Sequence, residues 1–186
     1  WLNHHPTDRV VLLDALTYAG NLENLDTFID APNLRFVKGN IRDSEQLDLI
    51  FSTESIDRLV HFAAESHVDR SILGPKSFIE TNVDGTLTLL EAARQHWTSD
   101  QNQRFIHIST DEVYGSLSLD QPPSTETDSY QPNSPYAASK AASDHLVRAY
   151  HHTYQLPTVT IHASNNYGPY QFPEKLIPLM ILNILE

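Results

Sequence analysis

The chain has 186 residues, of which 40% are hydrophobic, and this is enough to bury the core of one domain. Its formal net charge of -12 at pH 7 argues against a surface that neutralises nucleic-acid phosphates or anionic lipid, and the absence of cysteine excludes disulfides and thiolate metal sites. We therefore expect a cytoplasmic protein with no nucleic-acid partner and no membrane partner.

Short apolar runs rich in β-branched residues predict five strands, each buried on both faces, at 10–13, 34–37, 59–62, 105–108 and 159–161. Helical spacing of apolar residues predicts helices at 77–96 and 136–154, and a polar, proline-containing loop spans 116–134. Strands that alternate with helices indicate a doubly wound parallel α/β sheet. In such a sheet the ligand binds beyond the carboxyl ends of the strands.

The first strand ends at Asp14, and an acidic residue at this point is typical of the second strand of a dinucleotide-binding fold, where it binds the ribose hydroxyls. The six glycines of the chain never approach a G-x-G-x-x-G spacing. We therefore expect the fold to be incomplete, without its first strand and glycine-rich turn.

Tyr136 and Lys140 form a Y-x-x-x-K pattern, which places both side chains on one helix face about 6 Å apart along the axis. An ammonium beside a phenol favours the phenolate, so we expect Lys140 to lower the pKa of Tyr136 toward that of a general base. An isolated pair at this spacing is weak evidence for a catalytic site, because it occurs by chance on many solvated helices.

The run Ser109-Thr110-Asp111-Glu112 strengthens this interpretation because it follows the strand at 105–108 directly. A threonine hydroxyl can share a hydrogen bond with a substrate alcohol, and two carboxyl groups in different environments can divide into an acid and a base. The alternative is that the two carboxylates cap a turn or face water.

Three other features carry less weight. Ala63 and Ala64 follow the strand at 59–62 and would let a flat cofactor approach the backbone, or would form a tight turn. The segment 164–169 follows the last strand and is rich in Asn, Gly and Pro, which is also typical of a turn. The ten histidines lack metal-ligand spacing, so we expect surface or core histidines and no metal site.

Taken together, these residues resemble the extended short-chain dehydrogenases/reductases that act on nucleotide sugars, and among them the dehydratases. The resemblance covers essentially the whole chain and is carried by Asp14 with Leu16-Thr17-Tyr18-Ala19-Gly20-Asn21, His61-Phe62-Ala63-Ala64-Glu65-Ser66-His67-Val68-Asp69-Arg70-Ser71, Thr81-Asn82-Val83, Ser109-Thr110-Asp111-Glu112-Val113-Tyr114-Gly115, Tyr136 with Lys140, and Ser164-Asn165-Asn166-Tyr167-Gly168-Pro169-Tyr170-Gln171-Phe172-Pro173-Glu174-Lys175-Leu176. It implies a Rossmann-like NAD-binding domain over 1–186, in which the substrate-binding region begins at about 165–186 and the C-terminal substrate domain is missing.

The reaction that the resemblance implies is an internal redox dehydration of a nucleotide sugar, with dTDP-glucose as the expected substrate and NAD as the cofactor. Tyr136, assisted by Lys140 and Thr110, would take the proton of the sugar C4 hydroxyl while hydride passes to NAD. Glu112 would remove the C5 proton, and Asp111 would protonate the C6 hydroxyl that leaves as water. Hydride then returns to C6, so the product is a 4-keto-6-deoxy sugar.

The resemblance also implies binding residues. The expected cofactor contacts are Asp14, Thr17, Asn40, Ile41, Phe62, Ala63, Ala64, Thr81, Tyr136, Lys140 and Asn166. The expected substrate contacts are Ser66, Thr110, Asn165, Lys175 and Leu176. The chain departs from the family at Asn40, where Asp is usual, and at His162, where Arg is usual. An amide at position 40 still accepts a hydrogen bond from adenine, so we expect a weakened contact at most.

Several alternatives stay open. An epimerase or a UDP-glucuronate decarboxylase of the same family would share Tyr136 and Lys140, although it usually lacks the Asp111-Glu112 pair. A non-catalytic module that senses the nicotinamide cofactor, or an inactive truncated fragment, would keep the fold. As an entire polypeptide the chain is expected to be inactive. The resemblance further implies a homodimer that pairs through the helices at 81–96 and 136–154 as a four-helix bundle.

Overall fold

The computed structural model describes residues 1–98 and 102–186 and divides the chain into two compact units. One unit comprises residues 1–38 and 165–186, and the other comprises residues 39–164. Both units contain parallel strands and helices, and the fold is Rossmann-like, as the sequence predicts. None of the helices in the described ranges is long and apolar enough to cross a membrane.

The smaller unit is built on a pair of parallel strands, β1 (Val10–Asp14) and β2 (Leu34–Lys38), in which Val10 lies opposite Leu34. Between them lies a short 3-10 helix, η1 (Leu22–Leu25), whose first turn is capped by the Asn21 side chain. The unit also contains α6 (Leu176–Leu185). The two strands expected at 10–13 and 34–37 are therefore confirmed.

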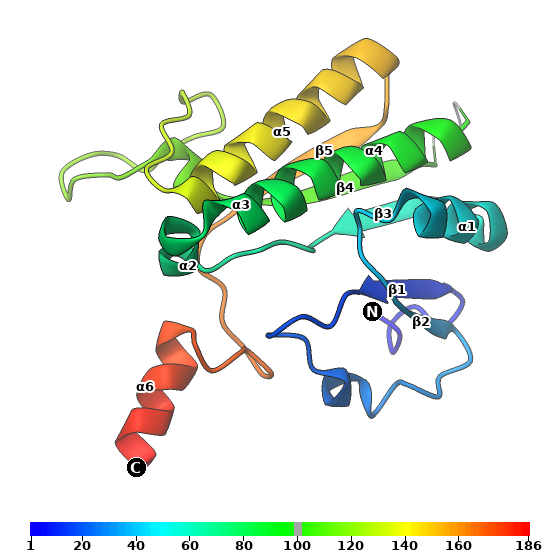
Figure 1. Cartoon of the computed structure of the whole chain (residues 1–186), viewed down its shortest axis with the longest axis horizontal. Helices are drawn as coiled ribbons and strands as arrows, with labels where there is room; N and C mark the ends of the chain where they lie inside the picture. The colour runs from blue at the N-terminus through cyan, green and yellow to red at the C-terminus, as the bar shows by residue number, and fades with distance from the viewer. Residues whose placement is uncertain (99–101) are drawn as a thin grey trace. The chain divides into compact units, whose positions relative to one another are not determined.

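The larger unit holds a sheet of three parallel strands in the order β3 (Arg58–His61), β4 (Arg104–Thr110) and β5 (Thr158–Ala163). Its helices are α1 (Ser44–Glu54), α2 (Val68–Leu73), α3 (Pro75–Phe78), α4 (Gly85–His96) and α5 (Pro135–Tyr154), with a π-helix η2 (Ile79–Asp84) and a 3-10 helix η3 (Asp111–Tyr114). Figure 1 shows α4 and α5 side by side along the strands, and they are in contact.

Local sequence signals explain where α5 begins and ends. The Ser134 hydroxyl accepts a hydrogen bond from the Ala137 amide at 3.0 Å, and Pro135 occupies the first helical position, where its missing N–H costs nothing. The helix ends at Gln155, which adopts a left-handed conformation with φ 58°. The helix predicted at 136–154 is thereby confirmed to within one residue.

The π-helix η2 interrupts the regular α-helix that the sequence predicts at 77–96. The chain passes from α3 through the π-helical turn 79–84 into α4 without leaving a helical path. A π-helical turn widens the backbone by one residue and is frequent at functional sites. Simple 3.6-residue periodicity does not reveal such a turn.

The expectation that every strand is buried on both faces is wrong for the larger unit. Alternate residues face opposite sides of a strand. The side of the sheet that packs against α5 carries buried Phe105 and His107, whereas Val60, Val159 and Ile161 each keep more than 40% of their surface exposed. Val60, Val159 and Ile161 therefore point away from α5, whereas the helix-facing side carries His107 as well as Phe105.

Candidate active site

The predicted pair of Tyr136 and Lys140 lies in the first two turns of α5, held in place by the Ser134 cap. Lys140 is buried, with 4% of its surface exposed, and its ammonium donates a hydrogen bond to the Ile108 carbonyl of β4 at 2.7 Å. Tyr136 is half-buried and its ring packs edge-on against Phe78. The catalytic face predicted for this helix therefore lies against the carboxyl end of β4.

The expected direction of the Tyr136 pKa is wrong for this structure. Burial raises the pKa of Tyr136, the Glu112 charge raises it further, and a hydrogen bond with Thr110 opposes both effects. Burial also lowers the pKa of Lys140 to about 8, and the Asp144 charge opposes that shift. Lys140 directs its ammonium to a backbone carbonyl, so its charge does not offset the burial of the phenol.

The residues that follow β4 occupy a compact turn. Thr110 ends the strand, caps η3, and accepts a hydrogen bond from the Glu112 amide through Oγ1 at 3.2 Å. The Asp111 carboxylate approaches the same hydroxyl at 3.5 Å. Both carboxylates are exposed to solvent. Thr110 and Glu112 therefore both interact with Tyr136, as their sequence positions predict.

The segment after β3 is open to solvent. Phe62 keeps 71% of its surface exposed, Ala63 and Ser66 are exposed, and Ala64 is half-buried. This segment lies at the carboxyl edge of the sheet because β3 ends at His61 and pairs with β4 in parallel. Its small side chains leave the backbone accessible to a flat ligand.

Asn82 holds this segment in place and was not recognised as a structural residue from sequence. Its side-chain oxygen accepts a hydrogen bond from the Glu65 amide at 2.9 Å, and its nitrogen donates to the Glu65 carbonyl at 2.9 Å and to the Ser139 hydroxyl at 2.9 Å. Asn82 is 1% exposed and lies in η2. One amide therefore joins the loop after β3 to α5, and its neighbour Thr81 is half-buried beside it in the chain.

Asn40 and Ile41 lie at the start of the larger unit. The Asn40 side chain accepts a hydrogen bond from the Arg42 amide at 3.0 Å. Ile41 is buried, and a Cβ built on Gly85 would lie 2.4 Å from its Cδ1 atom. The Ile41 side chain is therefore part of the core, so any contact of this residue with a ligand would come from its backbone.

The remaining predicted residues belong to the smaller unit, which is described on its own. Asp14 ends β1, and its carboxylate accepts a hydrogen bond from the Leu16 amide at 2.7 Å, while the Thr17 carbonyl accepts one from the Gly20 amide at 2.9 Å. Among the predicted binding residues of its C-terminal segment, Asn165, Asn166 and Leu176 are exposed to solvent. Lys175 directly precedes α6.

A buried polar cluster lies between the sheet and α5, and sequence reasoning missed it. Asp144 lies one helical turn after Lys140 and is 4% exposed. Its carboxylate meets His107 Nε2 at 3.1 Å, His162 Nε2 at 3.2 Å and the Ser109 hydroxyl at 2.9 Å. The recurrence of polar residues at the helix-facing positions of two strands is the only signal of this cluster in the sequence. That signal does not distinguish a joined cluster from the separate core or surface histidines that the sequence predicts.

The cluster extends to the neighbouring strand and loop. His61 Nε2 lies 2.9 Å from the Thr86 hydroxyl, and the His61 and His107 rings are 5.3 Å apart. The Tyr130 hydroxyl lies 2.8 Å from His162 Nε2. Burial lowers the pKa of both His61 and His107, which favours their neutral forms. Across the described residues, no group of three or more His, Asp or Glu side chains has the arrangement of a metal site.

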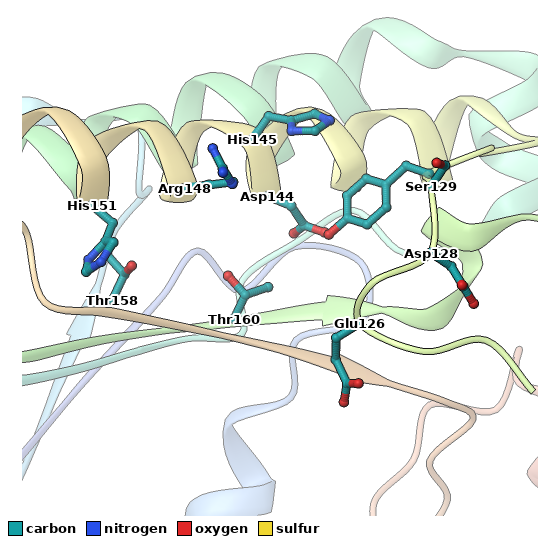
Figure 2. A pocket seen from close by; sticks show the side chains of 10 residues that line it. Glu126, Asp128, Ser129, Asp144, His145, Arg148, His151, Thr158 and Thr160 are labelled. Carbon is teal, nitrogen blue, oxygen red and sulfur yellow. The ribbon is translucent and has the colours of Figure 1, made fainter.

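An open pocket of about 550 Å³ lies on the outer side of this cluster. Figure 2 shows its walls, to which α5 contributes Asp144, His145, Arg148 and His151, β5 contributes Thr158 and Thr160, and the preceding loop contributes Glu126, Asp128 and Ser129. None of the residues predicted to act on a substrate lines it. The pocket is therefore a separate feature from the carboxyl edge of the sheet.

Residues 3–186 match the family model described as GDP-mannose 4,6 dehydratase. The chain is 55% identical over 192 residues to a dTDP-glucose 4,6-dehydratase of Salmonella typhimurium, with coverage of 96% of this chain and 53% of that protein. A dTDP-glucose 4,6-dehydratase of Xanthomonas campestris is 58% identical over 182 residues, with coverage of 95% and 52%. The chain thus spans about half the length of the curated relatives it matches.

Two solved structures give the same picture. The dTDP-glucose 4,6-dehydratase DesIV of Streptomyces venezuelae, solved with NAD bound, has a TM-score of 0.89 and 54% identity over 97% of this chain and 53% of its own. The UDP-glucose 4-epimerase of Thermus thermophilus, also a complex with NAD, has a TM-score of 0.81 and 32% identity over 92% of this chain and 52% of its own.

Proposed function

The chain belongs to the GDP-mannose 4,6-dehydratase family, and from this premise we propose that the full-length protein is a dTDP-glucose 4,6-dehydratase, a hydro-lyase that uses NAD. One observation carries the proposal beyond the family. Thr110 at the end of β4 and Glu112 just after it interact with Tyr136 on α5, and Lys140 binds the same strand. An acid-base set of this composition suits an elimination that also needs alcohol deprotonation.

The residues present fit a nicotinamide dinucleotide at the carboxyl edge of the larger unit. Ala63 and Ala64 offer only methyl groups, and the hydrogen bonds from Asn82 keep the backbone at Glu65 in one conformation. We propose that Phe62, Ala63, Ala64, Thr81, Tyr136 and Lys140 hold the cofactor, with Asn40 and Ile41 at the adenine. NAD would supply the hydride acceptor for C4 of the sugar and later the hydride donor for C6. The contacts of Asp14, Thr17 and Asn166 stay predictions.

In the proposed mechanism Tyr136 removes the proton of the C4 hydroxyl, and Thr110 hydrogen-bonds the same hydroxyl. Glu112 then removes the C5 proton, which the adjacent ketone has acidified. Asp111 gives a proton to the C6 hydroxyl, so that the C6–O bond breaks and water leaves. Burial and the Glu112 charge raise the pKa of Tyr136, which opposes formation of the phenolate in the unliganded protein.

We propose Ser66, Asn165, Lys175 and Leu176 as substrate contacts, because they lie in segments that resemble the dehydratases. The proposed assembly is a cytoplasmic homodimer that pairs through α4 and α5. Leu87 on α4 and Tyr154 on α5 support this, since each keeps more than a third of its surface exposed. Sedimentation of the full-length protein would measure its mass, and a monomer at all concentrations would contradict the assembly.

The experiment that tests the proposed activity uses the full-length protein with dTDP-glucose and NAD. The 4-keto-6-deoxy product is followed by the absorbance that develops in alkali. We expect product with the parent protein, a loss of at least a hundredfold in Glu112→Gln, and parental activity in Glu126→Gln, which makes the same change in the loop pocket. Turnover of UDP-sugars without loss of water would contradict the proposal and favour an epimerase or decarboxylase.

A further inference from the structure

The buried carboxylate of Asp144 joins three elements that carry the proposed active site. Asp144 belongs to α5, Ser109 and His107 belong to β4, and His162 belongs to β5. Its partners lie at 2.9 Å for the Ser109 hydroxyl, 3.1 Å for His107 and 3.2 Å for His162. Although burial disfavours the charged form, the hydrogen bonds from His107, His162 and Ser109 hold the pKa of Asp144 below its ordinary value. Asp144 is therefore a buried anion.

This anion lies beside the residues proposed to transfer the first proton. Lys140 is one helical turn before it on the same helix, and two residues four apart face the same side. Ser109, which donates to the carboxylate, directly precedes Thr110. The Asp144 charge opposes the loss of charge that burial imposes on Lys140, and it also acts on Tyr136. Among the described residues, Asp144 is the acidic group that raises the pKa of Lys140.

We propose that Asp144 is a positioning residue, which fastens the carboxyl end of β4 to α5 and supplies a buried negative charge one helical turn from Lys140. This inference rests on the proposed function, because it assigns Lys140 and Tyr136 to proton transfer. It explains why three elements direct hydrogen-bond donors at one buried carboxylate. A neutral side chain would still accept the hydrogen bond of the Ser109 hydroxyl but would remove this buried negative charge.

Other titratable groups interact with Asp144, Lys140 or Tyr136. They are His61 of β3, His107 of β4, His162 of β5, Tyr114, Asp111 and Glu112 of η3, Tyr130 of the loop, and Tyr136 of α5. Of these, His61 and His107 interact with Lys140, and burial favours the neutral form of both. Asp144 is thus the group whose removal should move the titration of Lys140 most.

The test compares full-length parent and Asp144→Asn in two measurements over pH. One is the pH profile of kcat and kcat/KM for dehydration. The other is the acetylation of Lys140 by acetic anhydride, read by mass spectrometry of its peptide, which needs no turnover. Loss of the anion destabilises the Lys140 ammonium and stabilises the Tyr136 phenolate. We therefore expect both profiles to move to lower pH by about one unit.

Two controls separate charge from packing. Asp144→Glu keeps the charge and should keep the parental pH profiles, although its longer side chain lowers stability. Ser109→Ala removes one hydrogen bond and leaves the carboxylate, so its profiles should also stay at the parental pH. If Asp144→Asn does not fold, His162→Arg places a permanent cation beside the carboxylate. It should lower the pH at which Lys140 reacts, by less than one unit.

The outcomes are distinguishable. A parent protein without dehydratase turnover contradicts the proposed function, while the acetylation of Lys140 still tests the role of Asp144. An active parent whose Asp144→Asn variant loses activity equally at every pH, with Lys140 reacting as in the parent, would show that Asp144 is only structural. Unchanged Lys140 reactivity in His162→Arg would overturn the inference in the same way.

Discussion

Replacing Asn82 by alanine should destabilise the protein by about 3 to 4 kcal/mol. The change removes three hydrogen bonds of 2.9 Å, two to the Glu65 backbone and one to the Ser139 hydroxyl. Each contributes about 1 kcal/mol, and the cost rises where a partner is left buried and unsatisfied. Asn82 is 1% exposed, so water cannot replace the amide without rearrangement of the helix.

Equilibrium urea unfolding of the cofactor-free protein, followed by circular dichroism, measures the free energy. Hydrogen exchange at the Glu65 amide measures the local effect, because that amide loses its acceptor. Ser139→Ala is the graded control, since it removes only one of the three bonds and should cost about 1 kcal/mol. A loss below 1 kcal/mol in Asn82→Ala, with the Glu65 amide as protected as in the parent, would refute the reasoning.

Three further predictions follow from packing, titration and the site. Gly85→Ala would place a Cβ 2.4 Å from Ile41 Cδ1 and should lower the free energy of unfolding, measured in thermal melts, by about 1 to 3 kcal/mol. Gly74→Ala is the control, because its nearest contact would be at 3.9 Å, and it should cost less than 1 kcal/mol. The pKa of Lys140 is about 8 in the folded protein and 10.5 for an unperturbed lysine, so the unfolded state binds more protons between these two pH values. The free energy of unfolding should therefore rise with pH by about 3 kcal/mol across that window, relative to Lys140→Met. If urea unfolding gives the same pH dependence for the two proteins, this prediction is contradicted. Thr110→Val should reduce the rate of dehydration at least tenfold, because it removes the hydroxyl that binds Tyr136 and the Glu112 amide. Thr110→Ser keeps the hydroxyl and should keep most of the activity. Equal rates in the two variants would argue against this role of the hydroxyl.

Strand positions and the two long helices were predictable because apolar runs and helical spacing act locally. The strands at 10–13, 34–37 and 105–108 lie within β1, β2 and β4, and the helix at 136–154 is α5. The proximity of Thr110 and Glu112 to Tyr136 was also predictable, since residues after parallel strands share one edge of a sheet.

Three-dimensional context decided what the sequence could not. The pKa of Tyr136 depends on its burial and on where the Lys140 ammonium points, and the ammonium binds the Ile108 carbonyl. Asp144 reads as an ordinary polar residue on a helix until β4 and β5 bring His107 and His162 to it. The exposure of Val60 depends on which side of the sheet the helices cover, and periodicity does not give that side.

The π-helical turn at 79–84 has a consequence for the divergence of related sequences. A π-helical turn holds one residue more than the α-helical turn that it replaces, so the helical segments on either side keep their phase. Removing one residue from 79–84 would therefore restore a regular α-helix and leave Thr86 beside His61 and Gly85 beside Ile41. The same removal from within α4 would turn the rest of that helix by about 100° about its axis. We therefore expect single-residue deletions among related chains to fall within 79–84 and to be excluded from α4.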